Sequence, residues 1–222
     1  MQTLPWDLQI LNALAALLLL LSFAMLSQRR VVTLVNLLAV QGALLCIATL
    51  LLARRTGAGH LYLSAALTLA LKVMFLPWVL HRLIHRLGVY WDTEPLLNIT
   101  GTMLIGVLVV VFSFGLAQPI SALASTATRS AIGIAVAVVL IAFLTMITRR
   151  KAMSQVVGFL SMENGLFFGA MSATYGMPMS VEFGVALDVL VAMLVLGVFF
   201  FQIREQFDSL DLQHLESLKE DR

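Results

Sequence analysis

The sequence has few charged residues and a single cysteine. Charged side chains make up 12% of its 222 residues, roughly half the share found in soluble domains. Cys46 stands alone in an apolar run, which excludes a disulfide framework and a cysteine-based metal site. A net charge of +2 gives no indication of nucleic-acid binding, and the histidines form no HExxH zinc motif. We therefore expect neither nucleic acid nor a metal ion as a ligand of this chain.

Long apolar runs dominate the rest of the sequence. Hydrophobic residues account for 60% of the chain and the mean hydropathy is +0.98. A transmembrane helix needs roughly 20 mostly apolar residues. The sequence predicts an all-α integral membrane protein with seven transmembrane helices, and Pro77 predicts a kink in the third. The predicted spans are residues 8–27, 31–53, 61–84, 96–117, 129–148, 152–175 and 179–204.

Basic residues are distributed unequally between the two sides of these spans. One side receives Arg54, Arg55 and Arg129, and Lys72 lies inside a helix. The other side receives Arg29, Arg30, Arg82, Arg86, Arg149, Arg150, Lys151, Arg204, Lys219 and Arg222. Because cytoplasmic loops carry the excess of Lys and Arg, the sequence predicts an external N-terminus and a cytoplasmic C-terminus. We expect the chain in the bacterial cytoplasmic (inner) membrane.

Two parts of the sequence resemble each other. Spans two and six each begin after an arginine pair, and spans three and seven contain Lys72-Val73 and Asp188-Val189. This pattern predicts two parallel three-helix repeats, spans one to three and five to seven, joined by span four. The organisation is then a first repeat (1–86), a connector (87–128), a second repeat (129–204) and a charged cytoplasmic tail (205–222). Spaced leucines favour a docking element in the tail, and a merely solvated tail is the alternative.

A few polar residues lie where the spans cross the middle of the membrane. Gln41, Lys72, Glu163 and Asp188 each lie about 14–17 Å from one end of a span, and a charge there costs about 2.5–3.5 kcal/mol. One interpretation is a hydrated relay with Glu163 and Asp188 as protonatable members and Lys72 as their charged partner. Gln41 and Asn164 would then be hydrogen-bonding links. The alternatives are polar contacts that only hold helices together, and a small-molecule or ion site.

The stretch RRKAMSQVVGFLSMENGLFFGAM, the LKVMFLPW helix, the lone Gln41 and the SLDLQHLESL tail resemble the hydrogenase-4 component E family. Its members are membrane subunits of formate hydrogenlyase-type, group 4 nickel–iron hydrogenase complexes. Spans five to seven more distantly resemble the NuoK subunit of respiratory complex I and the MrpC subunit of Na⁺/H⁺ antiporters. When this sequence is aligned with the NuoK pattern, the position of the key glutamate of NuoK falls on Leu160. Glu163 lies nearly one helical turn further on.

The resemblance implies a non-catalytic subunit of an oxidoreductase complex. It would lie between antiporter-like membrane subunits and a peripheral hydrogenase or electron-transfer arm, and couple redox chemistry to proton or ion movement. Nickel–iron and iron–sulfur centres would belong to the partner subunits, with no cofactor in this chain. A purely structural connector of such a complex and an autonomous small-solute carrier are the alternatives.

Overall fold

The computed structural model describes residues 6–57, 59–87, 90, 98–121 and 129–174. All of them belong to the first of two compact units, Met1–Asp188, and the second unit is Val189–Arg222. The seventh predicted span, Asp188 and the charged tail therefore lie outside the described residues. The repeat architecture, which depends on that span, stays a prediction.

Within the described residues, six helical segments are long and apolar enough to cross a membrane. They confirm the first six predicted spans to within a few residues. Three of the six are α1 (Trp6–Ser27), α2 (Val31–Thr56) and α5 (Ile99–Ser121); two more are α6 (Arg129–Thr148) and α7 (Ala152–Thr174). The remaining span is assembled from α3 (Gly59–Thr68), η1 (Leu69–Phe75) and α4 (Leu76–Leu87).

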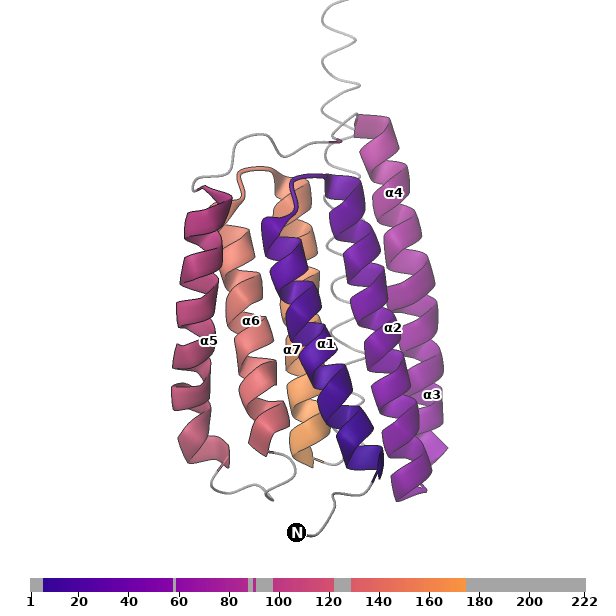
Figure 1. Ribbon diagram of the computed structural model, residues 1–222. Coiled ribbons are helices and arrows are strands. Elements are labelled where there is room, and N and C mark those ends of the chain that lie inside the picture. Colours follow the sequence, from indigo (N-terminus) through magenta and orange to yellow (C-terminus); the bar gives the residue numbers. More distant parts are fainter. Residues whose placement is uncertain (1–5, 58, 88–89, 91–97, 122–128, 175–222) are drawn as a thin grey trace, which may run out of the picture. The chain divides into compact units, whose positions relative to one another are not determined.

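These spans run up and down side by side (Figure 1). α6 packs against α1, α5 and α7, and α2 packs against α1, α7 and the whole of the third span. Apolar side chains fill the spaces between the helices, with Leu18, Leu45, Leu61 and Phe168 fully buried in the main cluster. α5 stands at one edge of the group and the third span at the other. The middle of the group is therefore formed by α1, α2, α6 and α7.

The third span changes helix type in its centre. Residues Leu69–Phe75 form a π-helix, in which the Leu76 N–H donates to the Leu71 carbonyl five residues earlier. Pro77, which follows at once, has no N–H to give to the preceding turn. The irregularity expected near this proline is thus a π-helical turn, and the kink itself stays a prediction. Such turns occur frequently at functional sites, and this one contains Lys72.

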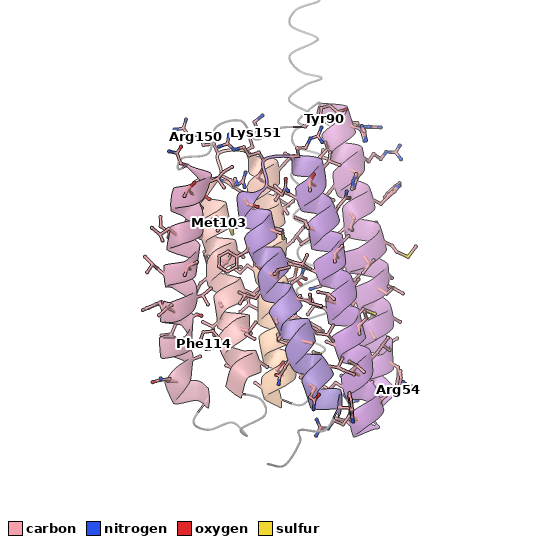
Figure 2. All side chains as sticks on the ribbon, viewed as in Figure 1. Arg54, Tyr90, Met103, Phe114, Arg150 and Lys151 are labelled. Carbon is pink, nitrogen blue, oxygen red and sulfur yellow. The ribbon has the colours of Figure 1, made fainter. Side chains whose placement is uncertain are left out.

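The two ends of the helix group differ in charge. One end, which we call the basic end, carries Arg29, Arg30, Arg82, Arg86, Arg149, Arg150 and Lys151. The other, which we call the opposite end, carries Arg54 and Arg55. Figure 2 shows Arg150 and Lys151 at one end and Arg54 at the other. The described helices therefore place the predicted basic loops together at one end, and the orientation in the membrane stays a prediction.

At the basic end, one buried arginine joins two helices. The Arg149 side chain follows α6 and donates to the carbonyls of Met25 and Leu26, at 3.4 and 3.0 Å, and to that of Gln28. The last carbonyls of a helix have no partner within the helix. Arg149 therefore caps the C-terminus of α1 and fixes it against the α6–α7 connection.

Candidate functional site

A buried ion pair connects the third span with α7. The Lys72 Nζ lies 2.8 Å from Oε1 of Glu163, and both side chains are only 3% exposed. Each is a residue that the sequence places near the middle of its span. The structure therefore brings two of the predicted relay residues into direct contact.

Two amides and a hydroxyl extend the pair across the helix group. Lys72 Nζ also donates to Oδ1 of Asn164 (3.1 Å), whose Nδ2 lies 3.5 Å from Oε1 of Gln41. Gln41 Nε2 then donates to Oγ of Ser22 (3.0 Å), which donates to the Leu18 carbonyl. In this chain every donor points away from the Lys72 ammonium. This hydrogen-bond chain links η1, α7, α2 and α1. We call the chain together with Glu163 the polar cluster.

The close approach of α2 to Lys72 depends on a glycine. A Cβ added to Gly42 would lie 3.0 Å from the Lys72 Cβ and 3.3 Å from its carbonyl carbon and oxygen. Any larger residue at this position would push the π-helical turn away from α2. Gly42 directly follows Gln41, so the same turn of α2 supplies a cluster member and the space beside it.

The aromatic ring of Phe167 covers another side of Lys72. Its centroid lies 5.2 Å from Nζ, a distance at which the ring face attracts a cation. Phe167 lies four residues after Glu163 on α7, so the two side chains project from the same face of that helix. The ammonium thus has a carboxylate, an amide oxygen and an aromatic face around it.

A small cavity adjoins the ion pair. It offers about 10 Å³ for the centre of a water molecule and is lined by Leu38, Lys72, Leu76, Leu160, Glu163 and Asn164. That volume is near the lower limit for one ordered water. The apolar part of its wall comes entirely from leucines.

The chemistry available here is proton exchange within a closely paired base and acid. One proton between Nζ and Oε1 belongs either to an ammonium beside a carboxylate or to a carboxylic acid beside an amine. The amides of Gln41 and Asn164 orient hydrogen bonds but do not take up protons near neutral pH. Within the described part of the chain, no group of three His, Cys, Asp or Glu residues is placed to hold a metal ion.

Four of the five predicted site residues lie in one cluster: Lys72, Glu163, Gln41 and Asn164. Asn164 shares Lys72 with Glu163 and also reaches Gln41, so adjacent residues of α7 serve the same group. Ser22 was missed, because a serine that bonds back to its own helix is the ordinary case. It does bond back to Leu18, but it also accepts from Gln41. Only its depth in the first span could have indicated this second role.

Comparisons with known proteins give two relationships. No protein-family model matches the sequence, and no solved structure matches it. Hydrogenase-4 component E from Escherichia coli K12 is 24% identical over 162 residues, which cover 73% of this chain and 75% of that protein. The same component from Shigella flexneri matches equally.

A mycobacterial protein is more similar. The uncharacterized protein Rv0085 of Mycobacterium tuberculosis is 37% identical over 187 residues, covering 84% of this chain and 85% of the relative. The resemblance to hydrogenase-4 component E, expected from the sequence, is thus supported as a distant similarity. Because it is 37% identical over 84% of its length, the chain belongs to the family of the mycobacterial protein Rv0085.

Proposed function

We propose that this chain is a membrane-arm subunit of a complex I-like, group 4 hydrogenase-type assembly, in which its polar cluster couples redox chemistry in partner subunits to proton or ion translocation. The distant similarity to hydrogenase-4 component E supports the kind of complex. The buried Lys72–Glu163 pair supports the role within it. The proposed partners are antiporter-like membrane subunits and a peripheral hydrogenase arm that holds the nickel–iron and iron–sulfur centres.

The ion pair carries this proposal because stability alone does not account for it. Inserting a charge at the centre of a bilayer costs about 2.5–3.5 kcal/mol. Replacing a buried ion pair by apolar residues is often neutral or stabilising. A pair surrounded by a directed hydrogen-bond chain and a cavity is therefore better explained by a charge that has to change during a reaction cycle.

In the proposed mechanism, the Lys72–Glu163 pair responds to charge in a neighbouring subunit. When a positive charge approaches, Glu163 is favoured as a carboxylate; when it leaves, the proton passes from Nζ to Oε1. The donors of Asn164 and Gln41 point away from Lys72 and support its charged form. Asp188 is the proposed next member of the relay, on the basis of the sequence alone.

The test uses the assembled complex, reconstituted in proteoliposomes, with redox turnover and proton movement measured together. Glu163→Gln keeps hydrogen bonding but cannot carry a proton, so we expect assembly and turnover with reduced proton movement. Lys72→Met should have the same effect, because it removes the charge that faces Glu163. Arg150→Met, which removes an exposed charge at the basic end, is the matched control and should pump as the wild type does.

The outcome separates the proposal from its alternatives. A structural connector would pump fully with Glu163→Gln and lose assembly only with Glu163→Leu. An autonomous carrier would be stable when purified alone and would bind a solute. Full proton movement in assembled Glu163→Gln and Lys72→Met complexes would refute the relay.

A further inference from the structure

The cavity beside the ion pair has an apolar wall on one side. On the side of the basic end, the cavity wall is made by Leu38, Leu76 and Leu160. Each lies three or four residues nearer to that end than Gln41, Lys72 and Glu163, respectively, which is one helical turn. All three leucines are buried. Leucines from α2, α4 and α7 therefore line the side of the pair that faces the basic end.

On the other side, polar residues follow one ridge of α3. His60, Ser64 and Thr68 precede Lys72 at intervals of four residues, a spacing that forms a continuous row on a helix surface. His60 is exposed in the first turn, whereas Ser64 and Thr68 are buried. At 1.5 Å per residue the row spans about 18 Å from the opposite end to Lys72.

Ser64 supplies independent evidence for water on this ridge. Its hydroxyl oxygen is buried and finds no hydrogen-bond partner among the described residues. A buried hydroxyl left in that state costs about 1–3 kcal/mol, and ordered water is the usual partner of such groups. The Phe167 ring covers the α7 side of Lys72, whereas the α3 ridge continues up to Lys72 with polar residues.

We propose that water and protons reach the Lys72–Glu163 pair from the opposite end, along the His60–Ser64–Thr68 ridge, and that Leu38, Leu76 and Leu160 form a dry barrier toward the basic end. Apolar constrictions of this kind close membrane pathways by excluding water. The purpose of the route rests on the proposed function. Its existence does not, because water access is measurable without turnover.

The experiment measures cysteine reactivity in the full complex. Cys46 is the only cysteine in the sequence, so Cys46→Ala removes every cysteine from this chain, and labelling is read on this chain after it is separated from its partner subunits. Ser64→Cys and Thr68→Cys report on the ridge, and Leu38→Cys and Leu160→Cys report on the barrier. Leu63→Cys, on the outward face of α3, is the control. Methanethiosulfonate ethylammonium reacts with the thiolate, which requires water, so we expect the ridge positions to react at least about tenfold faster than the barrier positions.

A second measurement connects access with function. Thr68→Val removes a ridge hydroxyl, and Thr145→Val is its control, because Thr145 donates only within α6, to the Ile141 carbonyl. Proton movement should fall with Thr68→Val and stay unchanged with Thr145→Val. Faster reaction at the barrier than at the ridge, or ridge rates equal to Leu63→Cys, would overturn the route. A reactive ridge combined with full pumping by Glu163→Gln would leave the route standing and refute the proposed function instead.

Discussion

Lys72 and Glu163 lie 91 positions apart in the chain, yet their charged atoms are 2.8 Å apart in the interior of the helix group. Both side chains are buried among α2, α7 and the π-helical turn. The two residues therefore act as one unit, and substitutions of Lys72 and of Glu163 should have non-additive effects on the free energy of unfolding.

This coupling predicts a non-additive effect on stability. Lys72→Met leaves a buried carboxylate facing an apolar group and should lower the free energy of unfolding by about 3–5 kcal/mol. The double variant Lys72→Met with Glu163→Gln should lose less than the sum of the two single variants. Denaturant titration of the assembled complex in mixed micelles, followed by a probe attached to this chain, compares the wild type, the two single variants and the double variant. Strict additivity would mean that the ion pair contributes no interaction energy.

Gly42 should be intolerant of even a single added methyl group. Gly42→Ala places a Cβ 3.0 Å from that of Lys72 and against its backbone, which should cost about 1–3 kcal/mol through overpacking. Gly115→Ala is the matched control, because a Cβ there meets nothing within 4 Å. It should be neutral or raise the unfolding free energy by up to about 1 kcal/mol. Unfolding midpoints in the same detergent compare the two, and equal shifts would contradict the close approach.

Arg149 should be more important for stability than its neighbour Arg150. Arg149→Met removes the donor to the last carbonyls of α1, and one hydrogen bond from a charged group contributes about 1.5–3 kcal/mol. We expect a loss of at least that size, whereas Arg150→Met, at an exposed position, should change stability by less than about 0.5 kcal/mol. Thermal unfolding of both variants checks this. If the exposed residue proves as important as the buried one, Arg149 does not cap α1.

The distribution of basic residues predicts the orientation in the membrane. A reporter fused after Arg222 should be cytoplasmic, and one inserted near Ala58 should be periplasmic. Enzymatic reporters that work on only one side of the membrane measure this. The reverse result would refute the predicted orientation and the parallel repeat that depends on it.

Several features could be predicted from the sequence because they follow from transfer energies. Apolar runs long enough to span a bilayer specify helices, since every backbone polar group must find its partner within the segment. Polar residues amid such runs are costly, so Gln41, Lys72, Glu163 and Asn164 were identifiable without coordinates. The pairing of Lys72 with Glu163 was one of several open combinations, because depth along a span says nothing about rotation around it.

The remaining features depend on how the helices pack. The π-helical turn changes the rotation about the helix axis of the residues that follow it, a difference that an apolar pattern does not record. Ser22 gained its second partner only because α1 lies beside α2. Gly42 and Arg149 have roles set by neighbours 30 and more than 100 positions away. The sequence by itself determined which residues are costly in the membrane and, to within a few residues, where the six described spans lie. Only the tertiary structure decided which costly residues meet, because contacts between helices depend on rotation and close approach that no local pattern encodes.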